Sequence, residues 1–268
     1  PSVRIALDDL DIRPLLAKAR DVDSDGQQRR RLRELLFEAM QLDGHMTQQS
    51  LKVSFHETAR VGKILYANVR TLDDTSLRAR DDEEFRIVVD YPFDESDAGP
   101  SDDEQRLHSY RMEANPTHTV VWLPSFFGAK VRRDLSELVL AEAVLSQSQR
   151  YLVDFRPEDH ERAKAQLTNL VAQKRASVLG ALHAAYGISM QLSHTLDSSK
   201  LATEHIHTLD ASLSVRPSGQ SQLSLALRDI VNQVLEARYP NHPRFTKKVN
   251  HQQLERELQV LEDLQDRP

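Results

Sequence analysis

Two short runs of β-branched residues, each ended by a proline, constrain the fold of this chain more than any other feature. The first run is 85–91 before Pro92, and the second is 119–123 before Pro124. Proline cannot donate to a strand ladder, so such runs are typical of short buried strands. Residues 103–112 between them suit a helix, and the sequence therefore predicts a βαβ unit with two parallel strands. Loops at the ends of such strands are where α/β sheets usually bind ligands.

Periodicity elsewhere predicts which elements surround this unit. Apolar residues alternate along 51–72, which indicates a hairpin or two adjacent strands separated at 58–62. Helical spacing predicts helices at 14–19, 27–40, 131–145, 157–187, 222–238 and 250–264. We expect the long helix 157–187 to pack on 131–150 or on 222–238, and residues 198–222 to form a long loop.

The fold class that follows is an α/β portion with a small mixed sheet of three to five strands, followed by an α-helical portion. We place the divisions at 1–48 for an N-terminal helical segment, 49–128 for the α/β portion and 129–268 for the helical portion. With 268 residues, of which 39% are hydrophobic, the chain is long enough to bury a core.

Composition narrows the function classes. The chain has no cysteine, which excludes disulfides and thiolate metal sites and fits a reducing cytoplasm. No apolar run approaches the length of a membrane span, so a cytoplasmic protein without a membrane partner is expected. The histidines and carboxylates match no zinc or calcium motif, and no metal site is predicted.

The strand 87–89 followed by Asp90 has the form of a strand that delivers a magnesium-binding carboxylate to bound nucleotide. The phosphate-binding loop that would complete such a site is absent from this sequence, so no catalytic residue is predicted. The alternative is a metal-dependent nuclease or nucleotide hydrolase centred on Asp90, Asp94 and Asp103. Otherwise Asp90 caps a turn or pairs with an arginine, and the acidic loop is solvated.

Basic and aromatic residues supply two further candidate surfaces. The net charge of −6 argues against a dedicated nucleic-acid-binding domain, but local basic groups can still follow a phosphate backbone. The candidates for such contacts are Arg30, Arg31, Arg33, Lys130, Arg132 and Arg133, with a second contact at Phe245, Lys247 and Lys248. Aromatic residues beside the proline-ended strands either fill the core or form an apolar patch for a partner; these are Tyr91, Phe93, Phe126 and Phe127.

Four segments of the chain together resemble the large P-loop ATPases of bacterial phage-resistance systems of the phage growth limitation and BREX type. They are residues 68–72 (Asn-Val-Arg-Thr-Leu), 85–95, 119–126 and 239–245 (Tyr-Pro-Asn-His-Pro-Arg-Phe). Because the chain begins at Pro1 and has no phosphate-binding loop, it is expected to be an internal piece of such a protein.

The resemblance implies that ATP and Mg²⁺ belong to the whole ATPase, and that no cofactor binds this piece. It also implies partners among the other phage-defence subunits, such as a DNA methyltransferase, with DNA as a further partner. We therefore expect a non-catalytic module that couples the nucleotide cycle of the ATPase to partner proteins or to DNA.

Overall fold

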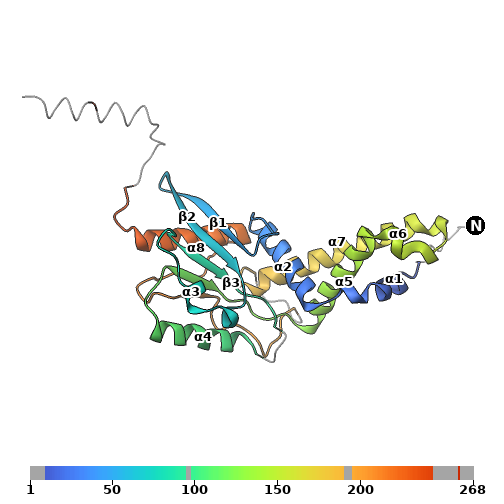
Figure 1. The fold of residues 1–268 in the computed structure, drawn as a ribbon, viewed down its shortest axis with the longest axis horizontal. Helices are drawn as coiled ribbons and strands as arrows, with labels where there is room; N and C mark the ends of the chain where they lie inside the picture. Colours follow the sequence, from blue (N-terminus) through green and yellow to red (C-terminus); the bar gives the residue numbers. More distant parts are fainter. Residues whose placement is uncertain (1–9, 95–97, 190–194, 244–258, 260–268) are drawn as a thin grey trace, which may run out of the picture.

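The computed structural model describes residues 10–94, 98–189, 195–243 and 259, and shows a sheet flanked by helices with a helical arm extending from it (Figure 1). The described residues form one five-stranded sheet in the order β1-β2-β3-β4-β5. Its strands are β1 (Gln48–Phe55), β2 (Thr58–Tyr66), β3 (Arg86–Val89), β4 (Thr119–Trp122) and β5 (Ile206–Thr208). The central three run parallel, and β1 and β5 pair antiparallel at the two sides. The predicted fold class and the parallel pair β3 and β4 are confirmed.

The β1–β2 hairpin turns at His56 and Glu57, which have φ angles of 44° and 65°. Two successive positive φ angles match the twist of a two-residue hairpin. The predicted break at 58–62 is therefore wrong, because those residues lie inside β2. Gly62 lies within that segment, and a glycine inside a strand resembles a turn signal in the sequence.

The apolar side chains of the short central strands point alternately to the two faces of the sheet, and both faces are buried. Ile87 and Trp122 pack in a core with α2 (Asp25–Ala39), α8 (Leu223–Arg238) and the end of α7 (His160–Ala185). Val88 and Val121 face the opposite layer, made by η2 (Val69–Thr71), α3 (Asp74–Leu77) and α4 (Pro100–Glu113). Successive side chains of a strand point to opposite faces of the sheet. A strand that is buried on both faces therefore has a continuous run of apolar residues in the sequence.

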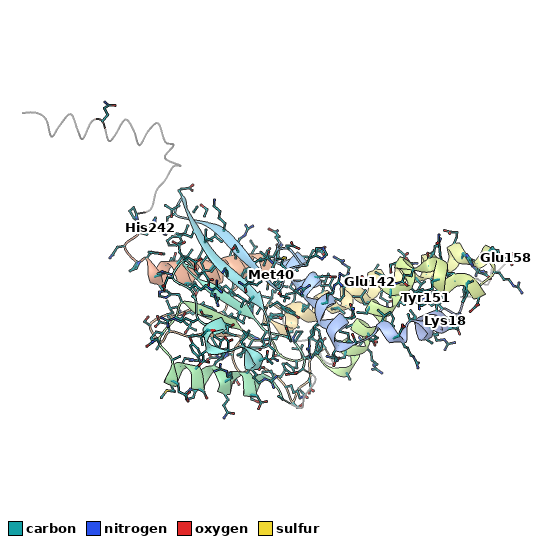
Figure 2. All side chains as sticks on the ribbon, in the orientation of Figure 1. Lys18, Met40, Glu142, Tyr151, Glu158 and His242 are labelled. Atoms are coloured by element: carbon teal, nitrogen blue, oxygen red, sulfur yellow. The ribbon has the colours of Figure 1, made fainter. Side chains whose placement is uncertain are left out.

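The helical arm is built on α7, a 26-residue helix. Its partner is α5 (Ala129–Ser146), one of the two predicted partners, and α1 (Arg13–Lys18), α6 (Ser148–Tyr151) and η3 (Leu152–Asp154) pack in the same core. The short helix η1 (Arg20–Val22) contacts α5, and η4 (Pro157–Asp159) contacts α7. Figure 2 shows Lys18, Tyr151 and Glu158 on this arm and His242 at the opposite end of the molecule. No described helix is both long enough and apolar enough to cross a membrane.

Other expectations need correction or fall outside the described residues. Residues 198–222 contain β5, which the sequence reading missed because only three residues pair with β4. The helix predicted over 103–112 begins earlier, at Pro100; Gly99 is its N-cap, and the Gly99 N–H donates to Asp102 Oδ2 at 2.7 Å. The predicted helix 250–264 and the contact at Phe245, Lys247 and Lys248 lie outside the described residues. The division at 129 stays a prediction, although β5 brings a later segment into the sheet.

Candidate functional site: a carboxylate–arginine cluster and a groove beside strand β1

The fold brings the three predicted carboxylates together at the end of the parallel strands. Asp90 directly follows β3, Asp94 lies four residues further along, and Asp103 is in the first turn of α4. Between them lies Arg70, which η2 holds after the end of β2. Arg70 is not predictable as part of this site from the sequence, because η2 and α4 meet only in the folded chain.

Arg70 links two of these carboxylates. Its Nε donates to Asp103 Oδ1 at 2.6 Å, and its Nη2 forms an ion pair with Asp94. Asn68 fixes the arrangement from both sides, because its Oδ1 accepts the Arg70 backbone N–H at 3.0 Å and its Nδ2 donates to Asp94 Oδ2 at 3.1 Å. The Asp103 side chain is only 2% exposed, so its charge is stabilised mainly by Arg70.

Asp90 is enclosed by backbone groups. Its two carboxylate oxygens accept the N–H groups of Tyr91 at 2.6 Å and Val69 at 3.1 Å, and the residue is 1% exposed. The hydroxyl of Tyr186 donates to the Asp90 carbonyl at 2.5 Å, which ties the end of α7 to the end of β3. This arrangement matches the turn-capping alternative and holds the β3 loop on η2.

Burial perturbs the acidity of this cluster. It raises the pKa of Asp103 to about 6, against the opposing effect of Arg70. Burial, followed by the negative charge of Asp103, raises the pKa of Asp90 well above its usual value. The cluster therefore takes up a proton at a pH where ordinary carboxyl groups are ionised.

We expect stability to respond to this protonation between pH 7 and pH 5. Because the folded pKa of Asp103 lies above the unfolded value near 3.8, the folded state binds more protons in that window, and the cluster contributes more stability as the pH falls. Other groups contribute to the pH dependence as well, so the measurement is the difference between the native protein and Asp103→Asn in urea unfolding at pH 7, 6 and 5. The native protein should gain stability relative to the variant, and parallel pH profiles would contradict this.

The cluster has the chemistry of a structural clamp. Its carboxylate oxygens accept hydrogen bonds from a guanidinium and from backbone N–H groups. The buried Tyr66 hydroxyl takes no part in this pairing, since it has no hydrogen-bond partner among the described residues. In the part of the chain that the structure describes, no group of three or more His, Asp or Glu side chains is arranged to hold a metal ion. The arrangement stabilises the loops at the end of the parallel strands.

The predicted basic residues lie in the middle of α2 and at the start of α5, where many of them have internal partners. Arg31 bridges Glu34 and Glu142, Arg33 donates to two backbone carbonyls, and Arg132 pairs with Asp25 at 2.9 Å. Arg30 pairs with Glu34 and is mostly exposed. Lys130 and Arg133 are also exposed, and both line a surface hollow with Asp197. The accessible cations of the predicted set are therefore Arg30, Lys130 and Arg133.

The predicted aromatic residues are mostly enclosed. Phe93, Phe126 and Phe127 are buried, and Tyr91 is half-buried. The guanidinium of Arg132 stacks 3.6 Å from the Phe93 ring centre, so one predicted basic residue covers one predicted aromatic residue. These positions favour the core-filling alternative, and a partner would reach these rings only after a rearrangement.

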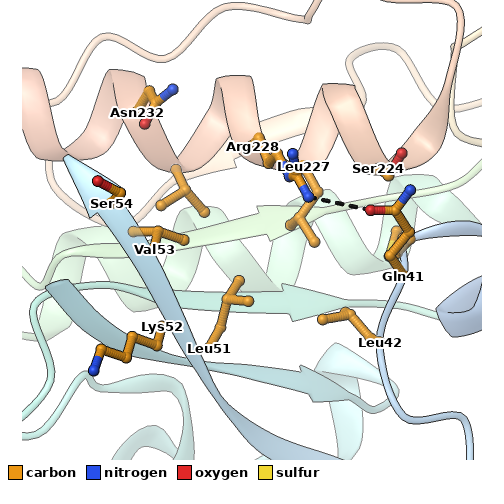
Figure 3. Close-up of a pocket in the computed structure, with 12 residues that line it drawn as sticks. Gln41, Leu42, Leu51, Lys52, Val53, Ser54, Ser224, Leu227, Arg228 and Asn232 are labelled. Carbon is orange, nitrogen blue, oxygen red and sulfur yellow. Dashed lines mark hydrogen bonds between the residues drawn. The ribbon is translucent and has the colours of Figure 1, made fainter. Parts of the chain in front are cut away.

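A groove that the sequence reading missed lies between β1 and α8 (Figure 3). Its volume is about 410 Å³, and apolar side chains form much of its lining. Those side chains are Met40, Leu42, Leu51, Val53, Leu227 and Val231. At its mouth, Arg228 Nη2 donates to Gln41 Oε1 at 3.1 Å. The sequence periodicity predicted both β1 and α8, but it does not predict the groove, because the groove depends on the distance between the two elements in the folded chain.

Comparison with known proteins places most of the chain in one family. The family model described as PglY fourth domain matches residues 15–239. This range begins in α1 and ends just after α8, so it covers both the sheet and the helical arm. No solved structure matches the chain.

Proposed function

Because the chain belongs to the PglY fourth-domain family, we propose that it is a non-catalytic module of a phage-defence ATPase, of the phage growth limitation or BREX type, which couples the nucleotide cycle to partner proteins or DNA. ATP and Mg²⁺ would act elsewhere in that protein. The main support is that internal partners already bind the carboxylates at the end of the parallel strands. Asp90 is enclosed by backbone N–H groups, and Asp94 and Asp103 are bound by Arg70, so the position suited to metal chemistry serves as a structural clamp.

The enzyme alternative requires these carboxylates to release their internal partners and face solvent. Asp90 is 1% exposed and Asp103 is 2% exposed, and freeing either would leave Arg70 or a buried N–H without its partner. The geometry therefore gives the nuclease or nucleotide hydrolase no support. Cleavage of DNA or ATP that requires Mg²⁺ or Mn²⁺ and is lost in Asp90→Asn would overturn the proposed module.

The test of the proposed module is direct binding to purified subunits of a phage-defence system, including the DNA methyltransferase. We expect one subunit to bind the chain in a calorimetric titration, and to bind again when the chain is part of the whole ATPase. A matched control is the same titration with a methyltransferase from an unrelated system. If every subunit and DNA leave the chain unbound, the proposed function fails.

DNA binding is tested separately, on the two exposed cations that lie at the start of α5. We expect Lys130→Glu/Arg133→Glu to weaken binding of labelled duplex DNA about tenfold at low salt and to flatten its salt dependence, since fewer counterions are released. The measurement is fluorescence anisotropy at two salt concentrations. The control Arg78→Glu/Arg216→Glu reverses two exposed charges elsewhere. An equal effect of both pairs would show only a response to net charge.

A further inference from the structure

We propose that the outer edge of β1 and the groove beside it bind an extended segment of a partner protein, which joins the sheet as an additional strand next to β1. The inference rests on the proposed function and gives its partner binding a defined surface. The occupant is a polypeptide with apolar side chains at alternating positions and an acidic side chain opposite Arg228.

The hydrogen-bond register of the hairpin leaves one side of β1 open. Phe55 and Thr58 flank the two-residue turn, and such a pair exchanges both of its hydrogen bonds across the hairpin. Hydrogen-bonded and non-hydrogen-bonded pairs then alternate along β1 and β2. The bond from the Tyr66 N–H to the Thr47 carbonyl, at 2.8 Å, fits this alternation. The residues between the bonding pairs direct their N–H and C=O groups away from β2; they are Gln48, Ser50, Lys52 and Ser54.

These outward backbone groups form a regular row. In the described part of the chain, β1 lies at the end of the strand order, and no hydrogen bond joins the backbone of Ser50, Lys52 or Ser54 to another segment. Native proteins usually block such an edge with a very short strand, charged side chains such as lysine, proline, a bulge or a covering segment. β1 is eight residues long with unbroken pairing to β2 and no proline, and Lys52 is its single charged residue. Among the described residues, therefore, no segment pairs with this edge, and Lys52 is the one residue of β1 that could block it.

The groove provides for the side chains of an added strand. Figure 3 shows Leu51 and Val53 between β1 and α8, while the Lys52 side chain points away. A strand paired with β1 would direct every second side chain toward the same face, over Leu227 and Val231 of α8. A groove of about 410 Å³ accepts two or three apolar side chains of moderate size. Backbone pairing then supplies affinity, and the groove supplies selectivity for alternating apolar residues.

The positive charge of Arg228 at the mouth of the groove favours a bound segment with an acidic side chain. Arg228 is exposed, and the hydrogen-bond partner that the structure describes for its guanidinium is the neutral amide of Gln41. No acidic residue is among the described residues that line the groove. A carboxylate on the incoming strand would pair with Arg228 in a partly desolvated position, where a charged hydrogen bond is stronger than at an open surface.

The test uses the whole chain and a displayed library of random nine-residue peptides. We expect enriched peptides to alternate apolar residues and to carry an acidic residue. A synthetic copy of the best peptide should bind Arg228→Glu at least tenfold more weakly, whereas Arg78→Glu, an exposed reversal on another element, should bind as the native chain does. N-methylation of the peptide at the residues that face β1 should abolish binding, and N-methylation at the intervening residues should preserve it.

Three results of the peptide experiment would overturn the proposal. They are the absence of enriched peptides, binding that Arg228→Glu leaves unchanged, and equal effects of the two N-methylation patterns. A concentration-dependent dimer in sedimentation that Lys52→Pro disrupts would instead assign the edge to a second copy of the chain. If a defence subunit binds the native chain and Arg228→Glu equally well, the proposed function stands and this surface is not the one used.

Discussion

Replacing Arg70 with Met is expected to lower the free energy of unfolding at pH 7 by about 3 kcal/mol, because it removes one partner of a buried ion pair. Asp103, at 2% exposure, would lose the donor that contacts it at 2.6 Å, and Asp94 would lose its ion pair with the same guanidinium. The measurement is urea unfolding at pH 7. The loss should be smaller at pH 5, since protonation neutralises Asp103, whose pKa burial raises to about 6.

The matched control is Arg175→Met, which removes an arginine from an exposed ion pair. Arg175 Nη2 lies 2.6 Å from Glu38 Oε1, and the side chains are 35% and 61% exposed. Exposed pairs contribute at most about 1 kcal/mol, so this variant should remain close to the native protein. Equal losses for Arg70→Met and Arg175→Met would mean that the cluster does not act as a buried clamp.

Replacing Gly62 with Ala is expected to destabilise the protein by about 3 kcal/mol, because the new methyl group has no room. A Cβ at Gly62 would lie 2.3 Å from the Phe85 backbone oxygen and 2.5 Å from a carbon of the Phe85 ring. Phe85 is fully buried just before β3, so neither the ring nor the backbone can move without disturbing the β2–β3 pairing. The expected result is a lower midpoint in thermal and urea unfolding.

The control for this change is Gly180→Ala on α7, where a Cβ would meet no atom within 4 Å. Alanine favours the helix by about 0.5–1 kcal/mol over glycine, so this variant should be slightly more stable than the native protein. The same substitution is therefore expected to change stability in opposite directions at two positions. A loss at Gly180 as large as that at Gly62 would refute the steric explanation.

Local patterns in the sequence determined most of the secondary structure. The apolar runs that end at Pro92 and Pro124 predicted β3 and β4, because proline and β-branched residues act on the backbone at their own positions. The stripe of apolar residues along 157–187 predicted α7 for the same reason. The carboxylates at the end of β3 were also identifiable, since their place follows from strand direction.

Only the tertiary structure decided how those carboxylates are paired and where a groove forms beside β1. Arg70 reaches Asp103 across 33 positions of sequence, and β5 pairs with β4 after the whole of α5 and α7. The groove depends on the distance between β1 and α8, elements more than a hundred residues apart in the chain. Periodicity records which face of an element is apolar. It contains no information about which distant element covers that face, because that choice depends on packing and on the partners of buried charges.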